Sequence, residues 1–170
     1  MAVLRIVKHG EPVLKKTSVS VDYEALKPDL PKLLKEMWAT MESVRGVGLA
    51  APQVGLNIRL SIIDVKPDGK RQRLVLLNPE LISLSGEVNE EEGCLSIPGV
   101  YAKVKRAARA RVRALDEHGK PWEMTGEGLL ARAFQHEIDH LDGKLFVDHL
   151  DFVHKLRVMS LIKDLKTTWA

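Results

Sequence analysis

The chain has 170 residues, of which 45% are hydrophobic and 29% charged, and its formal net charge is +3. This composition excludes a largely disordered chain and predicts one globular domain over residues 1–170, while so small a charge does not by itself indicate nucleic acid as a partner. No apolar run approaches the roughly 18 residues of a membrane span, and the first residues lack the charged-then-apolar order of a signal peptide. The single cysteine excludes an internal disulfide and suits a reducing compartment, so we expect a cytoplasmic protein without membrane contact.

Three helices are predicted from the spacing of apolar residues. The first covers about Asp29 to Val44, where apolar residues recur three and four positions apart and Pro31 suits the first turn. The second covers about Glu127 to Leu141 and ends near Gly143. The third is amphipathic and covers about Asp151 to Lys166.

Four segments between the first two helices have the composition and alternation of β-strands. They are Asn57–Val65, Arg73–Asn78, Ile82–Val88 and Tyr101–Leu115, with a turn at 67–69 between the first two. Strands that are mostly antiparallel and that pack around one central helix, with further helices near each end of the chain, give an α+β fold.

The strongest chemical signal is His136-Glu137-Ile138-Asp139-His140 in the central predicted helix. Residues four apart share a helix face, so both imidazoles can bind one metal ion. Glu137 is poorly placed to be a ligand, but it can accept a proton from water and return it to a leaving group. The alternative interpretation is a chance pair of helix histidines with no metal.

A catalytic metal site needs a third protein ligand and an open coordination position. Cys94, within the segment Glu91 to Pro98, is the better candidate because Gly93 permits a tight turn and two acidic neighbours would be unusual beside a core residue. Taken alone, a single cysteine is more often a small buried hydrophobic residue. The downstream alternatives are Asp142, Asp148, His149 and His154.

The glycine-rich run Gly46-Val47-Gly48-Leu49-Ala50-Ala51-Pro52-Gln53 ends the first predicted helix. It does not follow a strand and contains no Gly-Lys-Ser/Thr, which argues against a phosphate-binding loop. The run can be a simple helix stop and turn. Alternatively, its glycines would let a substrate backbone approach closely, and Gln53 would supply an amide donor.

The segments Gly48–Gln53, Glu92–Ser96 and Gln135–His140 resemble the three signature motifs of the peptide deformylase family, in the family's order. The resemblance extends to about Leu150 and so covers nearly the whole chain. It implies one divalent metal ion, commonly Fe(II), with zinc, nickel or cobalt as substitutes, and the implied ligands are Cys94, His136 and His140.

The resemblance also implies a role for the other motif residues. Glu137 would be the general base and then the general acid, while Gln53 and the backbone N–H of Leu95 would bind the oxyanion. Gly48 would bond to the substrate backbone, and the remaining substrate-binding residues would be Glu92, Gly93, Arg132 and Ala133. The usual role of an arginine at position 132 would be a solvated side chain or a salt bridge, and the alternative is a contact with the substrate backbone or carboxyl end.

The implied activity is hydrolysis of the N-formyl group from the N-terminal formylmethionine of new polypeptides, with release of formate. A bacterial cytosol is the expected location, although a processed organellar enzyme would look the same. The rival functions are a general metalloendopeptidase with a downstream third ligand and a metal-binding module without catalysis.

The basic block from Lys103 to Arg113 raises the question of RNA binding. Arg109, Arg111 and Arg113 alternate with small apolar residues, as on the solvent face of a strand, and no aromatic residues beyond Tyr101 are interleaved. We therefore expect no specific nucleic-acid partner. A separate hypothesis is a transient contact of this strand or of the C-terminal helix with the ribosome.

Overall fold

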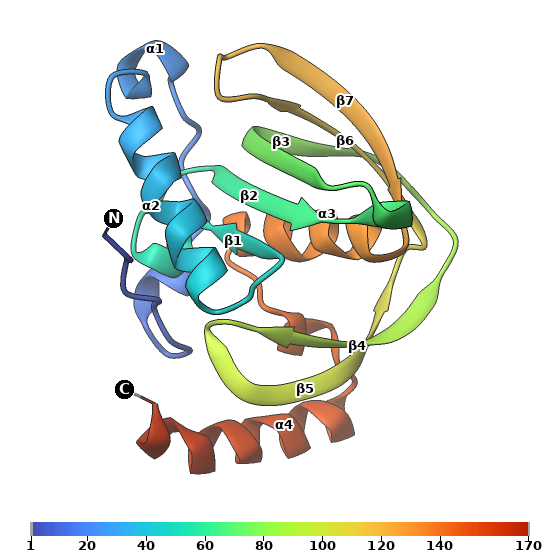
Figure 1. Cartoon of the computed structure of the whole chain (residues 1–170). Helices are drawn as coiled ribbons and strands as arrows, with labels where there is room; N and C mark the ends of the chain where they lie inside the picture. The colour runs from blue at the N-terminus through green and yellow to red at the C-terminus, as the bar shows by residue number, and fades with distance from the viewer. Residues whose placement is uncertain (1, 170) are drawn as a thin grey trace.

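The computed structural model describes residues 2–169 and shows two antiparallel sheets and a central helix between them (Figure 1). The larger sheet has the order β1-β2-β3-β6-β7, and its strands are Gly48–Ala50, Leu60–Val65, Gln72–Ser85, Arg109–Leu115 and Pro121–Glu127. The smaller sheet is a hairpin of β4 (Val88–Cys94) and β5 (Ile97–Arg106). This arrangement confirms the predicted α+β fold.

Four α-helices accompany the sheets: α1 (Tyr23–Leu26), α2 (Leu30–Ser43), α3 (Gly128–Leu141) and α4 (Phe152–Leu165). Helix α2 packs on one face of the larger sheet and α3 on the other, so neighbouring residues of β2 enter different cores. Ile62 packs in the cluster with α2, whereas Ile63 packs in the cluster with α3. Burial on both faces explains why β2 is apolar at most positions. No helix within residues 2–169 is long and apolar enough to cross a bilayer.

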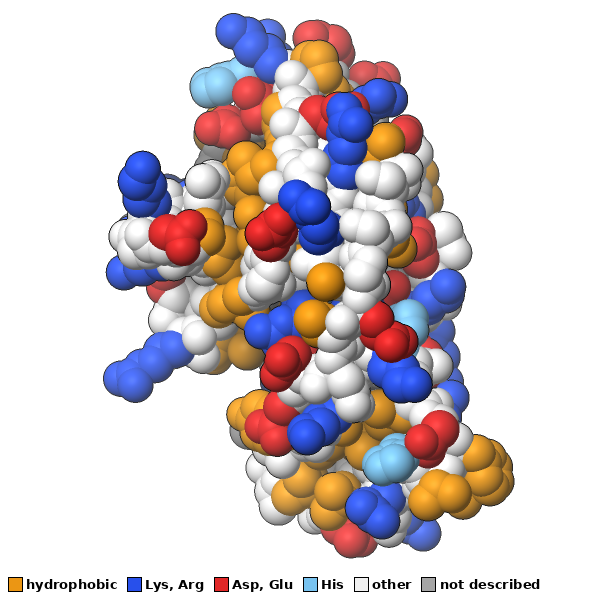
Figure 2. Space-filling model, turned by 90° about the vertical axis from the view of Figure 1, so that its right-hand side faces the viewer, with side chains coloured by type: hydrophobic (Ala, Val, Ile, Leu, Met, Phe, Trp, Pro, Cys, Tyr) orange, Lys and Arg blue, Asp and Glu red, His pale blue; other side chains and the backbone are white. Residues whose placement is uncertain are grey.

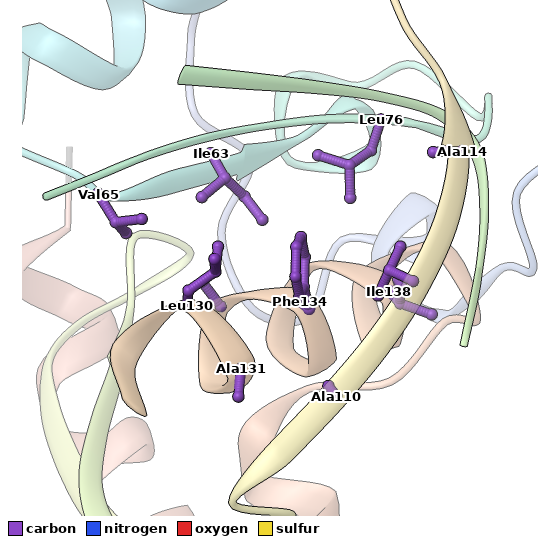
Figure 3. Close-up of a cluster of buried hydrophobic side chains, with 11 residues drawn as sticks. Ile63, Val65, Leu76, Ala110, Ala114, Leu130, Ala131, Phe134 and Ile138 are labelled. Carbon is purple, nitrogen blue, oxygen red and sulfur yellow. The ribbon is translucent and has the colours of Figure 1, made fainter. Parts of the chain in front are cut away.

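Helix α3 is held against the sheet by one apolar stripe. Leu130, Phe134 and Ile138 are spaced four apart and point at Ile63 and Leu76 of the sheet (Figure 3). His136 and His140 follow the same spacing two residues later, which places them on the opposite side of the helix. Packing of the apolar stripe therefore directs both histidines toward the β4–β5 hairpin.

The hairpin has its own small core on the side that faces α4, which lies below it in Figure 1. Ile97 and Val104 of β5 pack with Phe146, in the 3-10 segment Phe146–His149, and with Val158 and Ile162 of α4. The strand that carries Cys94 is thus supported from below by the last helix of the chain.

The predicted helices are confirmed within two residues at each end, but the strand boundaries differ from the prediction in two places. The segments Arg73–Asn78 and Ile82–Val88 belong largely to one strand, β3, in which Asn78 has a φ of 50° and the register shifts twice. The segment Tyr101–Leu115 is divided between β5 and β6, which lie in different sheets. Ala107 lies at the break, and its N–H donates to Gln135 Oε1 at 2.9 Å.

The arginines of β6 are exposed on alternate positions, as predicted. They pair with glutamates on the neighbouring strand: Arg109 with Glu127 at 2.8 Å, and both Arg111 and Arg113 with Glu123. Basic and acidic side chains are accordingly mixed over the face shown in Figure 2. These carboxylates offset the positive charge of the strand.

Candidate metal centre and active site

Cys94, His136 and His140 converge on one point, between the end of β4 and the face of α3. Their three ligand atoms all lie within 4.8 Å of one another. His140 Nε2 is 3.4 Å from Cys94 Sγ and 3.1 Å from His136 Nε2. A tetrahedral ion with bonds of about 2.0–2.3 Å would separate such atoms by roughly 3.3–3.6 Å, so the residues fit a divalent metal. The downstream alternatives for the third ligand are absent from this cluster, which is drawn from residues 2–169.

The two histidines differ in their protonation when no metal is bound. Burial disfavours the charged form of His136, but contacts with Cys94 and Glu92 overcome it and raise the pKa well above the usual value. Burial, together with the charge of His136, lowers the pKa of His140 well below the usual value. A metal ion must therefore displace a proton from His136, which couples binding to pH.

Glu92 orients His136 from behind. Its Oε1 atom lies 3.0 Å from His136 Nδ1, and its two oxygens also accept bonds from Arg106 Nε and Nη2 at 2.8 and 2.9 Å. Although burial opposes ionisation, the bonds from Arg106 and His136 lower the pKa of Glu92 to about 2. The carboxylate therefore stays charged, which fixes the imidazole with Nε2 toward the metal position.

The network continues from Arg106 to the surface of the molecule. Arg106 is buried and its Nη1 also donates to Asp139 Oδ2 at 2.6 Å. His149 Nε2 lies 2.7 Å from the same oxygen. His149 is thus linked to His136 through Asp139, Arg106 and Glu92 and lies outside the cluster of candidate ligands.

Glu137 lies at the floor of the site and is only 3% exposed. Burial raises its pKa to about 7, although the charge of His136 and a hydrogen bond from Ser61 oppose the shift. Ser61 Oγ donates to Glu137 Oε2 at 3.2 Å. A carboxyl with a pKa near neutrality is suited to accept and return a proton.

Gln53 is oriented by its own local backbone. The N–H of Ala50 donates to Gln53 Oε1 at 2.9 Å, which turns the amide NH₂ toward Cys94 Sγ at 3.5 Å and Ser96 Oγ at 3.2 Å. The amide therefore faces the metal position as a hydrogen-bond donor. Leu95, between Cys94 and Ser96 in the chain, lines the same cavity.

A cavity of about 550 Å³ opens onto these groups. Gly48 lines the cavity and lies so close to Glu137 that a Cβ at this position would be 2.6 Å from Glu137 Oε1. Of the predicted site residues, His140 alone is outside the lining and lies behind it, 1% exposed. The predicted residues that line the cavity are Gly48, Gln53, Glu92, Gly93, Cys94, Leu95, Arg132, Ala133, His136 and Glu137.

Several residues of the site were not predicted. Ser61 could have been identified from the sequence, because it is a polar residue within the apolar strand β2. Arg106 and Asp139 could not, since their roles depend on contacts between strands and α3. Lys8 and Arg45, which also line the cavity, lie outside the recognisable motifs.

Three converging metal-ligand atoms, a buried carboxyl and an oriented amide donor together are the arrangement expected of a metal-dependent hydrolase. Comparison with known proteins agrees with that class. The polypeptide deformylase family model matches residues 3–156. A peptide deformylase of Alkalilimnicola ehrlichii is 46% identical over 165 residues, covering 97% of this chain and 92% of the relative. A peptide deformylase of Elusimicrobium minutum is 43% identical over 176 aligned residues, which cover 100% of this chain and 100% of the relative.

Solved structures give the same result. The crystal structure of a peptide deformylase from Legionella pneumophila has a TM-score of 0.89 and 45% identity, covering 98% of this chain and 97% of that one. A peptide deformylase from Synechococcus elongatus in complex with actinonin has a TM-score of 0.85 and 38% identity, covering 94% of this chain and 86% of that one. The chain belongs to the peptide deformylase family, whose members are metal-dependent hydrolases that act on formylated nascent peptides.

Proposed function

We propose that this chain removes the N-formyl group from the N-terminal formylmethionine of new polypeptides, with residues 1–170 acting as one catalytic domain. The observation that carries the proposal is the convergence of a buried carboxyl, an oriented amide and three metal-ligand atoms at one cavity. Formate and a free methionine N-terminus would be the products.

Each group at the site would have its own role in hydrolysis. A divalent ion held by Cys94, His136 and His140 would lower the pKa of a coordinated water and polarise the formyl carbonyl. Glu137 takes the proton of the attacking water and returns it to the departing amine nitrogen. The amide of Gln53 and the N–H of Leu95 donate to the developing oxyanion, and each such donor contributes roughly 2.7–4 kcal/mol in comparable sites.

The remaining lining residues would bind the substrate. Because Gly48 has no side chain, the Glu137 carboxyl lies directly beside its backbone, which would bond to the substrate backbone next to the base. Ala133 would line the pocket for the methionine side chain, and Gly93, whose missing side chain leaves room for the Tyr101 ring, would border the bound substrate. Glu92 would act indirectly, by orienting His136. Arg132→Ala should raise KM with little change in kcat, and an unchanged KM would exclude a substrate contact for Arg132.

Fe(II) is the proposed native metal, with zinc, nickel or cobalt able to replace it. The Cys/His₂ ligand set suits several divalent ions. A thiolate on ferrous iron would make Cys94 sensitive to oxidation, so loss of activity in air with iron, but not with nickel, would support this assignment. The proposed location is the cytosol of a bacterium.

A transient contact with the ribosome would bring the enzyme to its substrate. The arginines of β6 are already paired with glutamates, which favours α4 as the contact. Phe152, Val153 and Leu156 are 77%, 63% and 57% exposed, and the lower end of the face in Figure 2 accordingly carries exposed apolar side chains. Absence of cosedimentation with ribosomes at low salt would exclude the contact.

Formate release from formyl-Met-Ala-Ser, by protein purified without oxygen, tests the reaction. The wild type should release formate, while Glu137→Ala should bind the metal and release none. No release by folded, metal-loaded wild type would refute the proposal. Internal cleavage of unformylated peptides would indicate an endopeptidase. Metal binding by both proteins with formate release by neither would indicate a metal-binding module.

A further inference from the structure

Three basic side chains line the cavity from three separate parts of the chain: Lys8, Arg45 and Arg132. Among residues 2–169, no carboxylate forms an ion pair with any of them. Every other arginine except Arg157 does pair with a carboxylate. The unpaired arginines are therefore concentrated at the cavity.

Arg45 occupies a backbone position where glycine would be expected. It follows the C-terminus of α2 with a φ of 54°, in the left-handed region that favours glycine. Its N–H donates to Glu42 O at 3.1 Å, and that of Gly46 donates to Met41 O at 3.0 Å, as at a helix C-terminus. The turn therefore gives no structural reason for a long basic side chain, and this side chain lines the cavity.

The backbone at Lys8 and at Arg132 belongs to segments that adjoin the site residues. The backbone on either side of Lys8 is anchored, because Val7 N–H donates to Gln53 O at 2.7 Å and His9 N–H donates to Ser96 O at 2.8 Å. Lys8 Nζ uses one of its donors on Ile6 O at 3.0 Å. Arg132 lies one helical turn before His136 and so shares its face of α3.

The acidic residues of the lining do not neutralise these cations. Glu92 is committed to Arg106 and His136, and Glu137 is buried at the floor. Glu91 is exposed, but it lies directly opposite Lys103 in the β4–β5 ladder. The mouth of the cavity therefore carries an excess of positive charge.

We propose that this mouth selects formylated peptides with an acidic side chain at the second or third position. The inference rests on the proposed function, because it places the formyl group beside Glu137 and Cys94. An extended peptide advances about 3.3–3.6 Å per residue, so the residues that follow methionine leave the floor and pass the basic side chains. Their carboxylates would meet cations from three sides.

The test compares amide-capped peptides that differ only in charge: formyl-Met-Asp-Ser, formyl-Met-Asn-Ser and formyl-Met-Lys-Ser, and the same set with the variable residue third. Capping removes the terminal carboxylate, and Asp and Asn have nearly the same shape. At low ionic strength, kcat/KM should be roughly 3- to 10-fold higher for Asp than for Asn at one of the two positions, and lowest for Lys. About 1 M salt should remove most of the difference.

Matched variants assign the preference to these side chains. Arg45→Gly should lower the Asp/Asn ratio without loss of thermal stability, because glycine suits the backbone there. Exchange of Lys8, Arg45 and Arg132 for glutamate should reverse the preference toward Lys. Arg157→Glu, at an exposed unpaired arginine of α4 outside the cavity, should leave the ratio unchanged.

The outcomes separate this inference from the proposed function. Turnover of the Asn peptides with equal or lower kcat/KM for the Asp peptides at both positions overturns the inference and leaves the deformylase assignment intact. No turnover of any formylated peptide refutes the assignment. In that case calorimetric affinities of the Asp and Asn peptides decide the inference, and equal affinities reject it.

Discussion

Glu137 is an ionisable residue whose burial serves chemistry at the expense of stability. Its pKa in the folded, metal-free protein is raised from 4.5 to about 7. The protonated form therefore favours folding: this contribution is fully present below pH 4.5 and is lost as pH rises through 7. Glu137→Gln, which cannot ionise, should stabilise the metal-free protein at pH 8 by up to roughly 3 kcal/mol, and the gain should shrink toward pH 5.

Denaturant unfolding of both proteins in the presence of a chelator measures this difference. Glu90→Gln is the control, because Glu90 is exposed on β4 and should show no comparable pH-dependent gain. Equal stability of wild type and Glu137→Gln at pH 8 would mean that ionisation of the buried carboxyl has no cost. Glu137→Gln should lose formate release whether or not it is more stable than the wild type.

Glu92 acts on the metal site through the orientation of His136. Glu92→Gln keeps the shape of the side chain but removes the charge that holds His136 Nδ1 and Arg106. Loss of such an outer partner typically lowers metal affinity about 10- to 100-fold. Competition with a zinc chelator measures the change, with circular dichroism to verify folding. An affinity equal to that of the Glu90→Gln control would remove Glu92 from the positioning role.

At the scale of elements, the helices were predictable and several strands were not. Helices α2, α3 and α4 each bury part of their surface and leave the rest in solvent. Their apolar residues therefore recur three and four positions apart in the sequence. Strand β4 forms an edge of a two-stranded hairpin and reads Val-Asn-Glu-Glu-Glu-Gly-Cys, so it has little apolar alternation. The bulges of β3 interrupt its alternation and led to two predicted strands.

The close packing of α3 against the sheet requires a glycine in β7. A Cβ on Gly126 would lie 2.8 Å from Leu130 Cγ and 2.9 Å from the Phe134 ring, closer than side-chain atoms normally approach. Gly126→Ala should therefore push α3 from the sheet and destabilise the protein by about 1–3 kcal/mol. Thermal unfolding checks this, with Thr125→Ala at an exposed position as control. Unchanged stability of Gly126→Ala would show that α3 can shift without cost.

Across the whole molecule, the site residues that the sequence revealed are those in short motifs. His136 and His140 are four residues apart on one helix, so local geometry alone brings them together. Ser61 lies 76 positions from Glu137, and Arg106 lies 33 positions from Asp139. Such pairs form only once the sheets have packed around α3, and no local pattern records them. The chemistry was thus predictable from motifs, while its tuning depends on the tertiary fold.

The last helix connects the stability of the molecule to its site without entering the cavity. Val158 and Ile162 of α4 are buried under the hairpin that carries Cys94, and Trp169 Nε1 donates to Pro98 O at 3.1 Å. No residue of α4 lines the cavity.

A chain that ends at Leu150 should lose about 3–6 kcal/mol of its free energy of unfolding, because two core side chains are removed and their partners are exposed. Its kcat/KM on formyl-Met-Ala-Ser should stay within a few-fold of the full chain at temperatures where both are folded. Denaturant unfolding and formate release measure the two effects separately. Full stability combined with lost activity would instead assign α4 a direct part in the reaction.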